Sequence, residues 1–297
     1  MRKVIQAGIA LLALALAMAG VAQAQSPPPN EAAQSGTTVG EVVVRGRKAP
    51  NIEKHLPSIV WKDVGVRAQP SHTGKLSRWI DQVCPGTFGL TPAYESFVSR
   101  RISDIARQIV PAPPVPCRGI NVLVAFTTVP QQFIDDVRNN HPGLLGYHYR
   151  VEEKALATFK GPVEVWFVTA TNGVIDNTDR PAMIGLASGR MRNRLASSIR
   201  FALVVVDANQ VQGHAIGPIA DHIAALVLSR SAPRTGCGPL PTILDVLDPA
   251  CPSSASLETL TAYDESFLKA LYATNPEDVG QSQRGSIMLH MLNDPHR

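Results

Sequence analysis

The sequence lacks most of the short motifs that identify catalytic or nucleotide-binding sites. It contains no G-x-S-x-G motif, which excludes the nucleophile elbow of an α/β-hydrolase. No G-x-G-x-x-G motif follows a predicted strand, so nothing supports a dinucleotide site. Thr73-Gly74-Lys75 is similar to the end of a phosphate-binding loop, but Gln69 stands where that loop requires its first glycine. We therefore expect no cofactor.

Aromatic residues are scarce, at 5% of the chain, and do not interleave with the basic residues. The arginines and lysines are scattered in small groups, at Arg45 to Lys48, at Arg100 and Arg101, and at Arg190 to Arg194. A surface that binds nucleic acid combines clustered positive charge with aromatic side chains on which bases stack. We interpret these groups as solvated faces and expect no nucleic-acid partner.

The eight histidines include no pair at the spacing i, i+4. That spacing places two imidazoles on one face of a helix, where a single zinc ion can bind both. His214 and His222 are eight positions apart, and His141 and His148 are seven apart. Either pair would have to meet through tertiary folding, so we predict no metal site.

Long apolar runs are absent after residue 21, whereas residues 1–24 have the pattern of a cleavable secretory signal. Arg2 and Lys3 precede an apolar stretch, and Ala22-Gln23-Ala24 supplies the small-x-small cleavage pattern. We expect a periplasmic or secreted bacterial protein, cleaved before Gln25, that is not an integral membrane protein. An uncleaved anchor is the alternative. Loss of the two basic residues would lower the net charge from +4 to +2.

Only four cysteines are present, and four cysteines allow three pairings. Proximity in the sequence favours Cys84 with Cys117 and Cys237 with Cys251. Neither pair has the C-x-x-C spacing of a zinc or redox site. We expect two structural disulfides, each stabilising the fold by about 3–4 kcal/mol in the chain-entropy model, in an oxidising compartment.

The chain divides into the signal at residues 1–24, a Pro-rich flexible spacer at residues 25–55 and a single globular domain at residues 56–297. The spacer contains a short β-rich segment, VGEVVVRGRK, at Val39–Lys48. This segment resembles the strand that opens the plug domain of TonB-dependent outer-membrane receptors. The resemblance implies an accessory role in which the segment adds to a sheet edge of an envelope protein partner.

Strands and helices are mixed without strict alternation, which predicts a single mixed-sheet domain of the α/β or α+β class with about five helices. Strands are expected at Asn121–Thr127, Val163–Thr169 and Arg200–Asp207. Five helices are expected: two that begin at Thr91 and Thr261, and three at Val129–Asn140, Gly217–Ser229 and Asp278–Leu292. The helix from Thr91 has an apolar face that includes Tyr94 and Phe97. The helix from Thr261 begins with a capping box that includes Asp264.

Asp221 and His222 are neighbours in the most apolar of these helices. A buried carboxylate needs a partner, so we expect Asp221 to be paired or at the helix surface, in the first turn where negative charge suits the helix dipole. Adjacent helical residues point about 100° apart and cannot address one substrate atom together. With His214, they are the candidates for an active site assembled by tertiary contacts, as in a periplasmic hydrolase with a non-standard site.

Four segments follow one another in the C-terminal third: the strand Arg200–Asp207, the helical IADHIAAL (Ile219–Leu226), LDVLD (Leu244–Asp248) and LTAYDESFLKALY (Leu260–Tyr272). Together they resemble secreted zincin-like proteins of unknown function, and the last segment is similar to one in matrixin-type metalloproteases. The resemblance covers about 70 residues and implies a zincin-like fold.

The resemblance also locates a departure from active zincins, whose helix carries the zinc motif H-E-x-x-H. Alignment places Asp221 at the first histidine, His222 at the glutamate and Ala225 at the second histidine. A shift by one residue places Leu226 at the second ligand instead. The side chains of Ala225 and Leu226 have no donor atom and cannot bind zinc. The resemblance therefore implies that the metal site is lost. It also implies a non-catalytic binding or envelope-associated domain.

Overall fold

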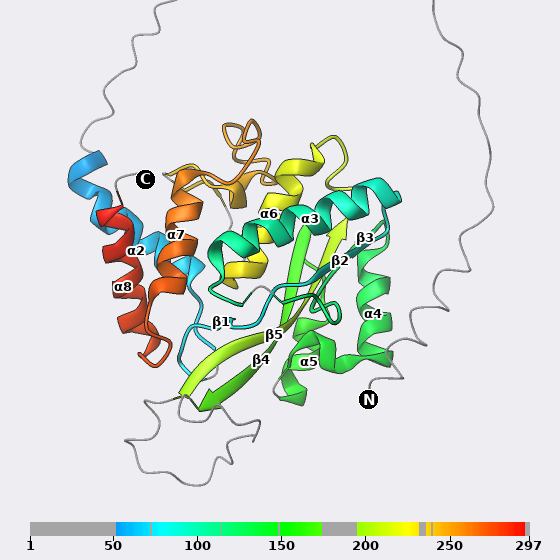
Figure 1. Ribbon diagram of the computed structural model, residues 1–297. Coiled ribbons are helices and arrows are strands. Elements are labelled where there is room, and N and C mark those ends of the chain that lie inside the picture. The colour runs from blue at the N-terminus through cyan, green and yellow to red at the C-terminus, as the bar shows by residue number, and fades with distance from the viewer. Residues whose placement is uncertain are drawn as a thin grey trace, which may run out of the picture. The chain divides into compact units, whose positions relative to one another are not determined.

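The longest strand, β5 (Leu195–Asp207), organises a mixed β-sheet (Figure 1). β3 (Val122–Thr127) runs parallel to β5 along one side, and β4 (Val163–Gly173) runs antiparallel along the other. The two-residue β1 (Arg78–Trp79) pairs in parallel with the first part of β5, and β2 (Pro85–Phe88) pairs in parallel with β3. The sheet confirms the predicted mixed α/β class.

The computed structural model describes residues 52–71, 73–113, 115–147, 149–173, 195–231, 236–238 and 240–294. The expected signal at residues 1–24, the β-rich segment Val39–Lys48 and His148 lie outside these ranges. The described residues contain seven α-helices and two 3₁₀ helices. The α-helices are α2 (Ile52–Arg67), α3 (Pro92–Ile109), α4 (Pro130–Asn140), α5 (Arg150–Leu156), α6 (Ile216–Ser229), α7 (Ala262–Ala273) and α8 (Gly280–Asn293); the 3₁₀ helices are η1 (Pro142–Leu145) and η3 (Ile243–Asp245).

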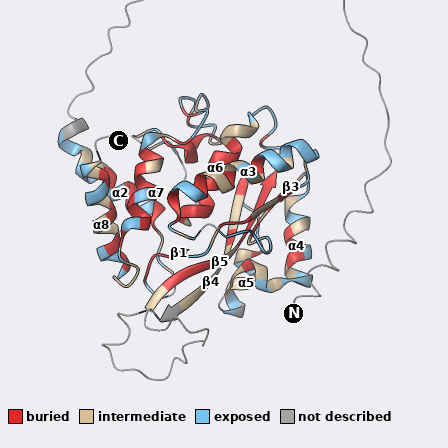
Figure 2. Ribbon diagram, in the orientation of Figure 1, coloured by how far each residue is buried: buried red, intermediate tan, exposed pale blue. Residues whose placement is uncertain are grey.

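Helices cover both faces of the sheet because side chains of β5 are apolar on both faces. Val204 and Val206 belong to the larger core, which α3 and α6 complete. Leu203 and Val205 belong to a second core against α4 and η1. Burial on both faces explains why β5 reads as a nearly continuous apolar run rather than an alternating one. Figure 2 shows the buried residues concentrated in the central strands and in α6.

A group of three helices, α2, α7 and α8, extends the larger core beyond the sheet (Figure 1). The segment around β1 joins this group to the sheet. Arg78 donates to the carbonyl oxygens of Leu271 at 3.1 Å and Thr274 at 2.7 Å, which caps the C-terminal end of α7. The indole N–H of Trp79 donates to the carbonyl oxygen of Val227 in α6, at 2.9 Å.

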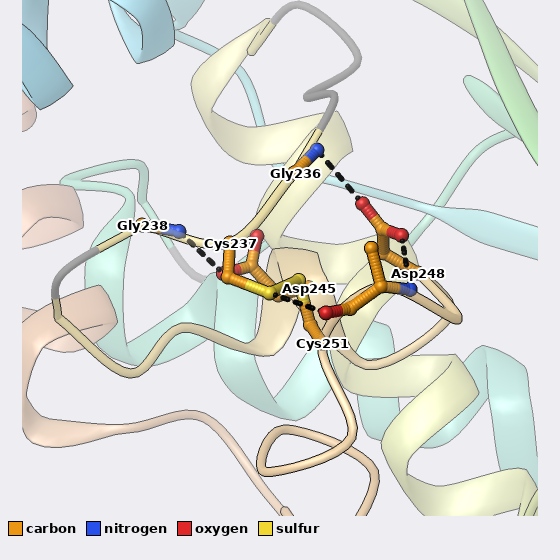
Figure 3. The surroundings of a disulfide bond; sticks show 7 residues. Gly236, Cys237, Gly238, Asp245, Asp248 and Cys251 are labelled. Carbon is orange, nitrogen blue, oxygen red and sulfur yellow. Dashed lines mark hydrogen bonds between the residues drawn. A yellow bond between two sulfur atoms is a disulfide. The ribbon is translucent and has the colours of Figure 1, made fainter.

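Both disulfides expected from sequence proximity are present. Cys84 directly precedes β2 and bonds to Cys117 in the loop before β3. Cys251 is fully buried and bonds to Cys237 across a segment that contains η3 (Figure 3). Two carboxylates fix the backbone beside Cys237: Asp248 accepts from the Gly236 N–H and Asp245 from the Gly238 N–H. The sulfur of Cys237 lies 3.0 Å from the Ala250 carbonyl oxygen, which is a contact and not a hydrogen bond because a disulfide sulfur carries no hydrogen.

The structure corrects three expectations about the elements. It contains seven α-helices in the described ranges rather than about five, because α2 and the seven-residue α5 were not predicted. α2 begins at Ile52, inside the predicted spacer that ends at residue 55. Tyr94 and Phe97 are 53% and 38% exposed, so the buried face of α3 begins only at Val98. No helix within the described ranges is long and apolar enough to cross a membrane.

Candidate functional site

α6 follows β5 after a short loop and is the most deeply buried helix that the structure describes. Each residue from Ile219 to Ser229 is buried, which confirms that a helix apolar nearly all round belongs in a core. α3 packs on one side of it, and η3 and α7 pack on others. The two candidate residues Asp221 and His222 therefore lie inside the protein, and their contacts decide what they can do.

Asp221 is fully buried and accepts four hydrogen bonds. Its Oδ1 receives the Nε–H of Arg101 at 2.5 Å, and its Oδ2 receives an Nη2–H of Arg101 at 2.8 Å. The same Oδ2 accepts from the Thr259 hydroxyl at 2.8 Å and from the Leu260 N–H at 2.9 Å. Two parallel bonds from one guanidinium are the strongest form of this pairing. Asp221 thus joins α3, α6 and the segment before α7.

The position of Asp221 in α6 differs from the expectation. The helix begins at Ile216, so Asp221 lies in the second turn and not in the first, and no acidic residue occupies the first turn. Its charge is balanced by Arg101 rather than by the helix dipole. Arg101 had been interpreted as part of a solvated face; its side chain is 37% exposed, but its guanidinium is committed to the buried Asp221. The hydrogen bonds to Asp221 raise the pKa of the Arg101 guanidinium above its ordinary value.

His222 lies on a different side of α6 and makes a separate structural contact. Its Nδ1 is 3.0 Å from the carbonyl oxygen of Ile243 in η3. Because a carbonyl oxygen only accepts hydrogen bonds, Nδ1 carries the proton of the neutral ring. Burial lowers the pKa of His222 below its ordinary value of 6.5, and outweighs the opposing effects of the Ile243 hydrogen bond and the negative charge of Asp264. The imidazole is therefore neutral at pH 7.

Asp264 is the centre of a second buried charge cluster, which the sequence indicated only as a capping box. The box is present: the Thr261 hydroxyl accepts from the Asp264 N–H, and Asp264 accepts from the Thr261 N–H. The Asp264 carboxylate also binds Arg67 Nη2 at 2.8 Å, the Thr242 hydroxyl at 2.6 Å and the Ile243 N–H at 2.8 Å. Burial alone would raise the pKa of Asp264, but Arg67 and these hydrogen bonds together lower it.

Arg67 has no exposed surface and lies against two aromatic rings. Its guanidinium carbon is 4.2 Å from the centre of the Phe267 ring and 5.6 Å from that of Tyr263. The Tyr263 hydroxyl donates to Asp63 at 2.6 Å, and Asp63 lies 3.7 Å from Arg67. Neither Arg67 nor Asp63 had been singled out, because nothing in a local sequence window pairs residues separated by about 200 positions. Asp264 had been predicted only as part of the capping box, and no cation had been assigned to it.

His214 and His222 do not meet in the part of the chain described here, and the pair of His141 with His148 includes a residue outside it. His214 is exposed in the loop before α6, whereas His222 is buried beside η3. His141 is exposed at the end of α4. Within the described ranges neither His214 nor His222 hydrogen-bonds to a carboxylate, so the pairing of histidine with carboxylate that a hydrolase would need is not assembled by these two residues.

The described residues contain no group of three or more His, Cys, Asp or Glu side chains able to hold a metal ion. Ala225, at the position of the second zinc ligand in the resemblance, is fully buried among apolar neighbours. Comparison with known proteins finds no matching family model, no similar curated protein and no similar solved structure.

Proposed function

We propose that this protein is exported and that its folded domain is a zincin-like scaffold that acts by binding and not by catalysis. The observation that carries the proposal is the commitment of Asp221, His222 and Ala225 to packing. Both Asp221 oxygens accept hydrogen bonds from Arg101, His222 donates to Ile243, and Ala225 has no donor atom. A catalytic zinc site needs three protein ligands and one open position. These residues do not fit that requirement.

The order of elements supports the zincin-like part of the proposal. The strand β5 leads into the buried helix α6, and a capping box then opens α7. This is the order of segments on which the resemblance rests. In this scaffold α6 serves as a core helix that joins the sheet to the helices α2, α7 and α8.

The two disulfides support the export part of the proposal, since structural disulfides persist mainly in oxidising compartments. The test is expression of the full chain in a Gram-negative host, followed by fractionation and N-terminal sequencing. We expect the periplasmic or secreted fraction to contain a chain that begins at Gln25. A chain that retains Met1 and stays in the cytosol would overturn export.

The non-catalytic part is tested by metal content and by thermal stability. The purified protein should contain no stoichiometric transition metal, and its melting temperature should be the same with and without EDTA. EDTA saturated with zinc is the matched control, because the chelator is then present but has no capacity left to remove zinc from the protein. Stoichiometric zinc, or a melting temperature that falls with free EDTA only, would overturn the proposal.

A further inference from the structure

A cavity of about 520 Å³ lies beside β4, away from Asp221 and His222. β4 is an edge strand in the described sheet, since it pairs with β5 alone. One wall is α5, a second is the end of η1, and the C-terminal end of α6 supplies Arg230. Pockets for small molecules commonly measure about 300–1,000 Å³, so the space suits a small ligand.

The lining of this cavity is about half apolar and half polar. The side chains of Leu156, Val165 and Phe167 contribute to it, together with the large ring of Trp166. The indole N–H of Trp166 donates to the Leu156 carbonyl oxygen at 2.6 Å, which fixes the ring in place. The apolar half of the lining favours contact with an aliphatic group.

Arg230 is the one cation among the described residues that line the cavity. It ends α6 in the left-handed conformation, with φ of 51°, and its N–H bonds to the Leu226 carbonyl oxygen at 3.0 Å. Its Nη1 is buried and has no hydrogen-bond acceptor in the described ranges. Burial lowers the pKa of the Arg230 guanidinium. A buried guanidinium nitrogen without an acceptor is unfavourable, and an anionic ligand at Nη1 would relieve it.

Two glutamates also line the cavity, and each is engaged elsewhere. Glu164 accepts from the Lys160 N–H at 2.7 Å, and Glu152 accepts from the Tyr149 N–H at 3.3 Å. Their negative charge disfavours a ligand with several charges, such as a phosphate ester. A singly charged carboxylate matches the single guanidinium, which can bind it through two parallel hydrogen bonds.

We propose that this cavity binds a small carboxylic acid with an apolar tail. The carboxylate lies against Arg230, and the tail lies along Val165 and Phe167 of β4. This inference goes beyond the proposed function and does not depend on it, because the cavity shares no residue with the helix positions aligned to a zinc motif. Metal in α6 would leave the inference standing.

The test uses the purified full chain with octanoate as the probe and octanol as its uncharged counterpart. Binding is measured by calorimetry and by the fluorescence of Trp166, with Trp166→Phe identifying its share of the signal. We expect saturable binding of octanoate, and affinity that rises about fourfold for each added methylene as the tail lengthens to decanoate. The absence of saturable octanoate binding in the calorimeter would overturn the proposal.

Two variants locate the ligand. Arg230→Asn removes the cation but retains a side chain that tolerates the left-handed conformation, so the end of α6 should be preserved. This variant should lower the affinity for octanoate by about tenfold or more and leave the affinity for octanol unchanged. Ala155→Phe should fill the cavity and lower the affinity for both octanoate and octanol. The matched control is Arg107→Asn, an exposed position on α3, which should change neither. Equal octanoate affinity in Arg230→Asn and the unmodified chain would overturn the proposal.

Discussion

Two aspartate–arginine pairs fix the helices of this domain, and they differ in access to water. In the first, Asp221 is fully buried and Arg101 is 37% exposed. In the second, Asp264 and Arg67 both have no exposed side-chain surface. The first pair makes two parallel hydrogen bonds, whereas Arg67 gives one hydrogen bond to Asp264 and stacks on aromatic rings.

The exposure of each arginine determines how sensitive its pair is to substitution. Arg101 can turn towards water when its partner is removed, because part of its side chain already lies at the surface. Arg67 has no such route, and its Nε and Nη1 already have no hydrogen-bond acceptor within the described ranges. Desolvation makes a buried ion pair costly to break even where its net contribution is small. The second pair should therefore be the more sensitive to substitution.

Asp264→Ala should give the largest loss of stability. It removes the carboxylate that is hydrogen-bonded to Arg67, leaving only Asp63 at 3.7 Å, and it removes the acceptor of the Thr242 hydroxyl. Removal of one partner from a buried pair costs about 3–5 kcal/mol. Urea unfolding measures the loss, with Asp104→Ala as the control for an exposed ion pair on α3, which should cost at most about 1 kcal/mol. Equal losses in the two variants would contradict the interpretation of the buried pair.

Asp221→Ala should destabilise the domain by a smaller amount, about 2 kcal/mol. The variant leaves the Leu260 N–H without its acceptor, but Arg101 can rotate into water. The same urea experiment measures the difference between this variant and Asp264→Ala. A loss for Asp221→Ala as large as that for Asp264→Ala would show that exposure of the arginine does not decide the outcome.

The elements that carry both pairs could largely be predicted from local sequence. The Thr261 capping box located the start of α7, and continuous apolar residues located α6 in the core. α2 was missed because Pro57 within it indicates a break, although the helix continues to Arg67. The short strands β1 and β2 were missed because two to four residues give no periodicity, and β2 begins with Pro85-Gly86.

The partners in the candidate site could not be predicted in the same way. The requirement that Asp221 be paired followed from its apolar helix, but the choice of Arg101 depends on how α3 crosses α6. Nothing in the local sequence distinguishes Arg101 from Arg100, which is exposed on the same helix. The cavity beside β4 was equally hidden, since Arg230 reaches it only through the left-handed end of α6.

The pH dependence of stability separates His222 from the neighbouring Asp264. The folded pKa of His222 is below its ordinary value of 6.5, so the unfolded chain binds more protons and stability falls as the pH decreases below about 6.5. The slope is at most about 1.4 kcal/mol per pH unit. The folded pKa of Asp264 is also lowered, and its contribution is lost only as the pH falls through its ordinary value of 3.8 and below.

His222→Asn tests this assignment, because the amide can still donate to the Ile243 carbonyl oxygen but does not titrate. Urea unfolding at several values between pH 7 and pH 5 should show a flatter profile for the variant than for the unmodified chain. Below the ordinary pKa of Asp264, both proteins should lose stability together. Parallel profiles between pH 7 and pH 5 would assign the slope to another group.

The smallest expected loss of stability comes from a variant that changes the hydrogen-bond geometry between Arg101 and Asp221. Arg101→Lys keeps the positive charge but cannot make the two parallel hydrogen bonds that the guanidinium gives to Asp221. We expect a loss of about 1 kcal/mol in urea unfolding. Arg100→Lys is the matched control on the same helix and should be neutral. If both lysine variants are as stable as the unmodified chain, positive charge alone stabilises the buried Asp221. The contrast between the two pairs would then come from burial and not from the two parallel hydrogen bonds.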